Sequence, residues 1–577
     1  MKPHRFLPAA IVCALLAQDS NQPIARVTTR LVELNVIVRD KSGPVSDLAK
    51  EDFTILENGK PRKIAFFSKN VAPPESVAQT PQQAAGGVVT NRPNGAGETP
   101  VNVTVVLLDA LNTEIRDQQF AKQEFLQFLK QIRPEDRVAV YTLGTKLHVL
   151  NDFTSDAKRL AAVVNRYSGE NIGLAEAAGA PLSDAPDGIG TDKIIQDAIN
   201  NHMNDLVSDY TVRMRAETTA AAMEAIANHI GHIPGRKSLI WISASFPFVI
   251  GHIGDGQTNS EDTAFDDDIS GVTAAKKKGG MSQSTTLYGA NDRDGSPART
   301  QMNFTEAAMR ATRALNNANV AVYAVDARGL TGMVKSMTVE QNYGISGSAA
   351  RTPPKLTSTI NTSSTALHTM ADSTGGLVFQ NTNGIRQAIQ SAIQDGEVTY
   401  TLGFYPESSS LDSKYHNLKV QVKRKDVELR YRRGYLAVPD SQLTAQERGA
   451  QVRDVLWSPL PATAIGLIAG LEKGDKPGTI RMQVALEPRD LLLEKKGDRW
   501  TGALDLVFAQ RAADGSDLGL TTTPLGLSLD QQRYELIFRD GLSITKMLDV
   551  APHAVELRVV VFDRGSGKVG SLTVPLN

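Results

Sequence analysis

An apolar run that ends in an aspartate constrains the fold more than any other stretch of the chain. Residues 103–108 read Val-Thr-Val-Val-Leu-Leu and are followed directly by Asp109. The run is rich in β-branched residues and too short for a buried helix, so it predicts a central strand of a parallel sheet covered on both faces. Polar residues just past the carboxyl end of such a strand lie where open α/β sheets bind ligands.

Strands and helices are predicted to alternate from residue 101 to residue 397, as a doubly wound α/β fold requires. The first helix, near residues 117–132, carries Phe125 and Phe128 on one face, which is expected to pack on the sheet. Further strands are predicted at 138–143, 238–243, 320–325 and 377–380, and further helices at 218–232, 306–317 and 385–394. We therefore predict an α/β fold class with a central, doubly wound, mostly parallel sheet. Three inserts rich in Gly, Ser, Asp and Asn interrupt it, at residues 171–200, 249–300 and 330–362.

Period-two alternation of apolar residues predicts all-β modules on both sides of this region. The expected boundaries are a β-module at 25–70, a linker at 71–100, a second β-module at 398–437, a linker at 438–455 and a third module at 456–577. The third has short strands separated by Gly and Asp turns, as in an immunoglobulin-like β-sandwich. The first two modules are each too small to bury a core alone, so we expect them to fold together around the inserted α/β domain.

The beginning of the chain and its overall charge indicate an exported protein. Lys2 and Arg5 precede the apolar stretch 7–17, and this combination predicts a signal peptide at residues 1–18. The only cysteine, Cys13, lies inside it, so no disulfide is expected in the mature chain. The sequence after this stretch contains no run of 18 apolar residues, so no further transmembrane segment is predicted. The formal net charge is −1, so we expect no nucleic-acid partner. The predicted signal peptide implies a periplasmic or extracellular location.

Several motifs in order resemble an acidobacterial family of exported proteins related to von Willebrand factor A domains. The matching segments are VRDKSGPV (38–45), EDF (51–53), LDALNT (108–113), PGRKSLIW (234–241), YAVDARGL (323–330) and YTLGFYP (400–406). The resemblance implies a von Willebrand factor A-type domain that binds protein partners and performs no catalysis. Ordinary domains of this type bind through a metal-ion-dependent adhesion site made of Asp-x-Ser-x-Ser, a later Thr and a further Asp.

This chain departs from that pattern. Asp109 matches the first carboxylate and Thr113 can replace the second serine, but Leu111 stands where the first serine hydroxyl belongs. A degenerate site for Mg²⁺, Mn²⁺ or Ca²⁺ would draw its oxygens from Asp109, Asn112, Thr113, Ser243 and Asp326. The alternative is a structural network with no metal, because an aspartate at a strand end often caps the next helix or bonds loop amides.

The leading functional hypothesis is therefore a non-enzymatic adhesion protein that uses the carboxyl edge of the sheet and the three inserts. Its partner would be another protein or a component of the cell envelope or extracellular surface. One alternative is a structural scaffold of the cell envelope without metal-dependent binding. Another is a serine hydrolase that uses Ser243 with Asp326, although the sequence has no nucleophile-elbow motif and places no base near that serine. No catalytic residue and no organic cofactor is predicted.

Overall fold

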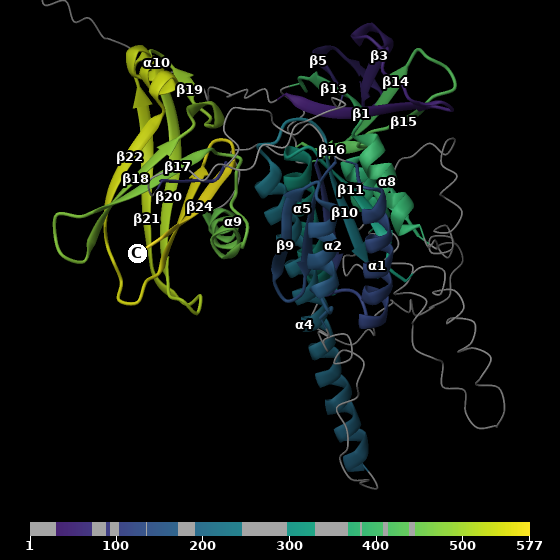
Figure 1. Ribbon diagram of the computed structural model, residues 1–577, viewed down its shortest axis with the longest axis horizontal. Helices are drawn as coiled ribbons and strands as arrows, with labels where there is room; N and C mark the ends of the chain where they lie inside the picture. Colours follow the sequence, from purple (N-terminus) through teal and green to yellow (C-terminus); the bar gives the residue numbers. More distant parts are fainter. Residues whose placement is uncertain are drawn as a thin grey trace, which may run out of the picture.

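The computed structural model describes residues 31–71, 88–92, 103–133, 136–170, 191–244, 297–328, 367–380, 384–407, 414–437 and 445–576. The predicted signal peptide, and the parts of the predicted inserts at 171–190, 249–296 and 330–362, lie outside these ranges. The described residues form three units (Figure 1), named here the split β-module, the mixed-sheet domain and the C-terminal sandwich.

The split β-module is built from two segments that are far apart in the sequence. Its elements are β1 (Val32–Asp40), β2 (Gly43–Pro44), η1 (Lys50–Asp52), β3 (Phe53–Glu57), β4 (Lys60–Arg62), β5 (Ile64–Val71), β13 (Val398–Phe404), β14 (Tyr415–Val422), β15 (Glu428–Arg430) and β16 (Gly434–Leu436). Val36 lies opposite Tyr400 in the β1–β13 pair, and Ile55 lies opposite Val420 in the β3–β14 pair. These residues belong to one apolar core, so the two segments fold as one unit with the mixed-sheet domain inserted between them.

The mixed-sheet domain carries the strand that ends in Asp109. Its elements are β7 (Val103–Asp109), α1 (Ile115–Phe128), η2 (Leu129–Gln131), β8 (Arg137–Leu143), β9 (Leu147–Thr154), α2 (Ala157–Arg166), α4 (Thr191–Ile230), β10 (Lys237–Ser243), α5 (Pro297–Asn317), β11 (Val320–Asp326), β12 (Val378–Phe379) and α8 (Ile385–Asp395). The strand order is β12-β11-β10-β7-β8-β9, and every pair is parallel except β8–β9. One apolar cluster includes residues of α4 and α5, and a second includes residues of α1, α2 and α8.

The helix α4 is much longer than the sequence pattern predicts. It begins at Thr191, inside the span predicted as an insert, and runs to Ile230. Figure 1 shows its first half projecting away from the rest of the molecule. The second half packs on α5 and the sheet, and it places polar side chains beside the end of β7.

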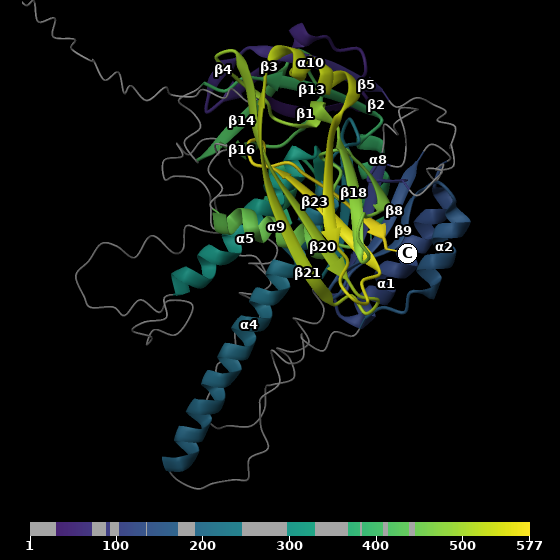
Figure 2. The ribbon, with the colours of Figure 1, turned by 90° about the vertical axis from the view of Figure 1, so that its left-hand side faces the viewer.

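The C-terminal sandwich contains two antiparallel sheets with an apolar core between them. Its elements are β6 (Val88–Thr90), α9 (Ala445–Trp457), β17 (Leu467–Lys473), β18 (Thr479–Leu486), η5 (Pro488–Asp490), β19 (Glu494–Lys496), β20 (Arg499–Arg511), β21 (Asp517–Leu529), α10 (Gln531–Asp540), β22 (Leu542–Asp549), β23 (Glu556–Asp563) and β24 (Val569–Pro575). The helix α9 covers the outer face of β20 and β23 (Figure 2). Figure 1 shows it between the sandwich and α4.

A short strand from the predicted linker completes one of these sheets. The strand β6 pairs with β17, and Asn91 follows it. The Asn91 amide donates to the carbonyl oxygens of Ala462 at 2.7 Å and Ile465 at 2.8 Å, and its oxygen accepts from the amide of Leu467 at 2.8 Å. Part of the 71–100 segment is therefore bound to the C-terminal sandwich.

A buried carboxylate joins the split β-module to the mixed-sheet domain. Asp395, at the end of α8, is fully buried. It accepts hydrogen bonds from Arg430 at 2.9 and 3.0 Å, from Arg39 at 3.3 Å and from the Tyr323 hydroxyl at 2.7 Å. Because a buried charge is costly unless it is paired, these contacts fix the relative position of the two units.

The predicted fold class is wrong for the chain as a whole. In the described ranges, strand residues outnumber helical residues, and four of the five sheets are antiparallel. The chain is therefore mostly β, with curled antiparallel sheets, and is not an α/β protein organised around one central doubly wound sheet. The error has a physical origin, because short antiparallel strands that are half exposed give a weaker sequence signal than fully buried strands. Among the described residues, no helix is long and apolar enough to cross a membrane.

Candidate functional site

The five predicted site residues all lie at the carboxyl edge of the mixed sheet. Asp109 ends β7, Ser243 ends β10 and Asp326 ends β11. Ser243 lies opposite Asp326 in the register of β10 and β11. Asn112 and Thr113 follow in the loop after β7. Parallel strands end at the same side of a sheet, so a sequence pattern that places polar residues after each strand brings them together.

The Asp109 carboxylate is buried and surrounded by hydrogen-bond donors. Its residue is 2% exposed. It accepts from the backbone amide of Asn112 at 3.0 Å, from the Asn112 side-chain amide at 2.8 Å and from the Trp241 indole N–H at 3.0 Å. Burial raises the pKa of Asp109, although hydrogen bonds from Asn112, Trp241 and Ser243 favour its charged form.

Asn112 connects this carboxylate to α4. Its side-chain amide also contacts the Thr219 hydroxyl at 2.9 Å, and its oxygen accepts from Nε of Arg215 at 2.9 Å. Burial lowers the pKa of Arg215, and the charge of Asp109 partly opposes this effect. The Arg215 guanidinium group, on the helix that covers the sheet, is therefore linked to the Asp109 carboxylate through the Asn112 side chain.

Thr113 and Asp326 make separate contacts at the same edge. The Thr113 hydroxyl accepts from the backbone amide of Ala244 at 3.0 Å, which ties the loop after β7 to the loop after β10. Asp326 accepts from Nε of Arg328 at 2.9 Å, from Nη2 at 2.7 Å and from the Arg328 amide at 2.9 Å. These hydrogen bonds to Asp326 raise the pKa of Arg328.

As arranged here, these side chains fit a divalent cation poorly. A hard cation needs oxygen lone pairs directed at one point, whereas N–H donors point at both Asp109 oxygens and at both Asp326 oxygens. Leu111, at the position of the expected serine, is 3% exposed and packs in the core. In the described ranges, no group of three or more His, Cys, Asp or Glu residues could hold a metal. The metal site therefore stays a prediction.

The surroundings of Ser243 do not favour the serine-hydrolase alternative. Ser243 is fully buried, and it hydrogen bonds to the Asp109 carboxylate. A nucleophilic serine needs a base that can take its proton and a path for the substrate. The Asp326 carboxylate, its expected partner, is instead bound by Arg328.

Sequence reasoning missed three side chains that complete the network. Trp241 is fully buried in β10, and its indole N–H binds Asp109. Arg215 lies just before the predicted start of the α4 helix at residue 218, and Thr219 lies just after it. The signal that would have identified Trp241 is its indole N–H, a donor that usually finds an acceptor when the side chain is buried in an apolar strand.

Comparisons with known proteins give distant similarities only. No protein-family model matches the chain, and no curated protein sequence matches it. Similar solved structures include an aerotolerance-related membrane protein from Bacteroides fragilis, with 11% identity over 51% of this chain and 98% of that chain and a TM-score of 0.23. The PilB minor pilin from Streptococcus sanguinis is 10% identical over 52% of this chain and 62% of that chain, with a TM-score of 0.23. A von Willebrand factor type A protein from Catenulispora acidiphila is 10% identical over 89% of this chain and 74% of that chain, with a TM-score of 0.22.

Sequence identities and TM-scores as low as these carry no argument about function. The von Willebrand factor A part of the predicted resemblance has a weak structural counterpart, whereas the acidobacterial family stays a prediction.

Proposed function

We propose that this chain is a non-enzymatic structural or adhesion protein outside the cytoplasm, and that the carboxyl edge of its mixed sheet works without a divalent cation. The observation that carries the proposal is the Asp109 carboxylate, whose oxygens are both engaged by donors from Asn112 and Trp241. Such a carboxylate stabilises the loop that contains Asn112 and Thr113. It is therefore a structural element of the edge, and partner contacts would come from the surrounding surface.

The connections between units support a scaffold in particular. Asp395 joins the split β-module to the mixed-sheet domain, and Asn91 joins the linker to the C-terminal sandwich. Thr463, in the sandwich, donates its backbone amide to the carbonyl of Asn228 at 2.9 Å. A protein whose units are joined by buried polar contacts can transmit force or hold partners at fixed spacing. Adhesion through a metal remains the competing proposal.

One experiment separates these two proposals. Mg²⁺, Mn²⁺ and Ca²⁺ are titrated calorimetrically into the full chain and into Asp109→Asn, and urea unfolding of both is measured with and without metal. We expect no saturable binding up to millimolar metal. We also expect Asp109→Asn to lower the free energy of unfolding by about 2–5 kcal/mol. The new side-chain NH2 group would replace a carboxylate oxygen, so buried N–H donors of Asn112 or Trp241 would lose their acceptor.

The matched control is Asp498→Asn, which changes an exposed aspartate in a turn and should alter stability by less than about 0.5 kcal/mol. Saturable metal binding that Asp109→Asn abolishes, in a variant that unfolds like the wild type, would refute the metal-free proposal and support the metal-dependent adhesion site.

A further inference from the structure

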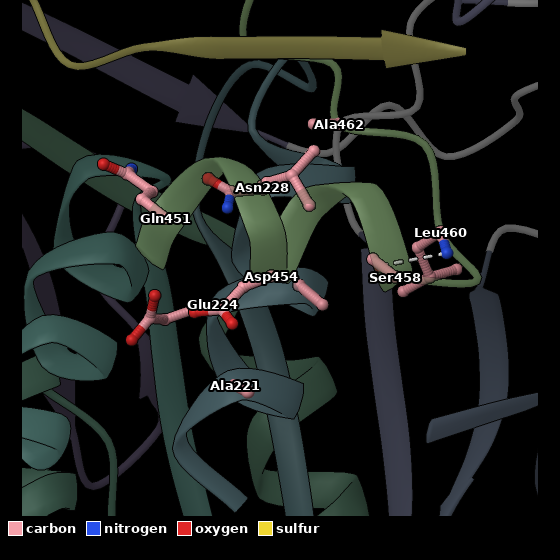
Figure 3. Close-up of a pocket in the computed structure, with 10 residues that line it drawn as sticks. Ala221, Glu224, Asn228, Gln451, Asp454, Ser458, Leu460 and Ala462 are labelled. Carbon is pink, nitrogen blue, oxygen red and sulfur yellow. Dashed lines mark hydrogen bonds between the residues drawn. The ribbon is translucent and has the colours of Figure 1, made fainter. Parts of the chain in front are cut away.

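The contact between α4 and α9 holds two acidic side chains in a confined space. The second half of α4 belongs to the mixed-sheet domain, and α9 belongs to the C-terminal sandwich. A cavity of about 10 Å³ lies between them, lined by Glu224 and Asn228 of α4 and by Asp454 of α9, among others (Figure 3). This volume is close to the minimum needed for one water molecule. The two carboxyl groups therefore share a small polar space between two units.

Glu224 is only 6% exposed, whereas its ion-pair partner is accessible to solvent. Nε of Arg310 lies 3.3 Å from the Glu224 carboxylate, and the Arg310 side chain is 42% exposed. An ion pair with one exposed member is weakened by solvent screening. Arg310 therefore offsets only part of the cost of burying a charged Glu224.

Other charged groups surround the two carboxyl groups from each neighbouring element. Arg313 on α5 also attracts Glu224, while Arg453 on α9 attracts Asp454 and Glu217 on α4 repels it. Burial is nevertheless the largest influence on both carboxyl groups. It raises the pKa of Glu224 to about 7 and also raises the pKa of Asp454, and the charge of Asp454 adds to the effect at Glu224.

The same contact continues at the end of α4 through two histidines. Nδ1 of His229 lies 3.0 Å from the carbonyl oxygen of Pro461, and Nδ1 of His232 lies 2.8 Å from the Thr463 hydroxyl. Asp152 of β9 faces His229, with 3.9 Å between Nε2 and the carboxylate. Burial lowers the pKa of His232 to about 4, with further lowering from nearby cations including Arg92, His229 and Lys237, so this histidine is neutral in mildly acidic solution.

We propose that the α4–α9 contact is a pH-dependent latch, which holds the C-terminal sandwich against the mixed-sheet domain more tightly in mildly acidic than in alkaline solution. A protonated Glu224 can donate a hydrogen bond to Asp454 or to a water in the cavity, whereas two ionised carboxylates there repel each other. The folded pKa of Glu224 lies above its ordinary value of 4.5. At Glu224 the closed contact therefore binds more protons than the open one between about pH 4.5 and 7, and this contribution to its stability falls as the pH rises through that window. His232 acts in the opposite direction, because its folded pKa of about 4 lies below the ordinary value of 6.5. The closed contact binds fewer protons there between about pH 4 and 6.5, which offsets part of the effect of Glu224.

The latch is tested by hydrogen exchange of the full chain at pH 5.5 and pH 8.5. The backbone amide of Thr463 reports directly on it, because that amide donates across the contact to Asn228. Rates are divided by the intrinsic exchange rate at each pH. If opening hydrates both groups fully, the Glu224 contribution to protection falls by roughly 30-fold between the two pH values and the His232 contribution rises by roughly 10-fold. For the wild type we therefore expect a net fall of roughly 3-fold. Amides of β20 and β23 in the interior of the sandwich should keep their protection.

Two variants make the test specific. Glu224→Gln removes the falling contribution and leaves that of His232, so protection at Thr463 should rise by roughly 10-fold from pH 5.5 to pH 8.5. Asp454→Asn should weaken the fall seen in the wild type. The control Glu535→Gln changes an exposed glutamate on α10 and should leave the wild-type pH dependence intact. Protection at Thr463 that is independent of pH in the wild type would overturn the proposal, and so would an unchanged pH dependence in Glu224→Gln.

Discussion

Lys237 is a buried cation whose replacement should stabilise the protein. It begins β10, is 2% exposed and donates from Nζ to the carbonyl oxygen of Ile233. Burial lowers the pKa of Lys237 to about 7, and the charge of Glu33 opposes this only in part. The lysine is therefore neutral in the folded protein at pH values where it is charged in the unfolded chain.

The size of the effect follows from this pKa. A fall from 10.5 to about 7 corresponds to about 5 kcal/mol of stability lost at pH 6. In Lys237→Met this loss disappears, but the carbonyl of Ile233 loses its donor, which costs about 1–3 kcal/mol. The variant should therefore be more stable than the wild type by about 2–4 kcal/mol at pH 6.

Urea unfolding between pH 6 and pH 10 measures the effect and its sign. The folded wild type binds fewer protons than the unfolded chain between about pH 7 and 10.5, so its stability should rise with pH by up to about 1.4 kcal/mol per pH step. Lys237→Met should lack this rise when compared with the exposed control Lys158→Met. A variant that is less stable than the wild type at pH 6, with the same pH dependence, would refute the reasoning.

Three further substitutions test individual buried contacts, each measured by urea unfolding. Asn91→Ala removes a side chain that bonds three backbone groups of the sandwich, and should lower the free energy of unfolding by about 2–4 kcal/mol. A loss below about 0.5 kcal/mol, in the range of an ordinary surface change, would contradict its role. Asp395→Asn leaves Arg430 without its buried counter-charge and should cost about 3–5 kcal/mol, so a neutral result would show that solvent reaches the site. Gly376→Ala places a methyl group where it overlaps the carbonyl oxygen of Val322, and should cost more than about 3 kcal/mol unless the β11 backbone shifts freely.

The sequence was sufficient to place the residues of the candidate site and insufficient to describe their bonding. Polar residues after buried strands come to one edge because parallel strands share a direction, so Asp109, Ser243 and Asp326 could be grouped without a structure. What those side chains bind depends on partners from α4 and from the middle of β10, and neither can be assigned from strand order. Arg215 lies outside the predicted helix, so its contact with Asn112 had no sequence basis.

Two larger features were also beyond the sequence signal, for different reasons. The strand β6 has three residues, and it forms because β17 offers an unpaired edge and Asn91 satisfies three backbone groups. A strand of that length in a Pro- and Gly-rich segment has no pattern of its own. The first half of α4 is rich in Asp and Asn, which have low helix propensity, so its composition indicates a loop and not a helix.

The strand-end aspartate shows why residue identity alone does not define a cation site. The chemical difference between a cation site and a structural network is whether the groups around the carboxylate donate or accept. Serine hydroxyls can turn their lone pairs toward a cation, whereas the indole N–H of Trp241 can only donate. With Trp241 and the Asn112 amides directed at Asp109, a cation would have to displace donors that would then be buried without an acceptor. Trp241 therefore argues against a cation site as strongly as Leu111 does, the residue at the position of the expected serine.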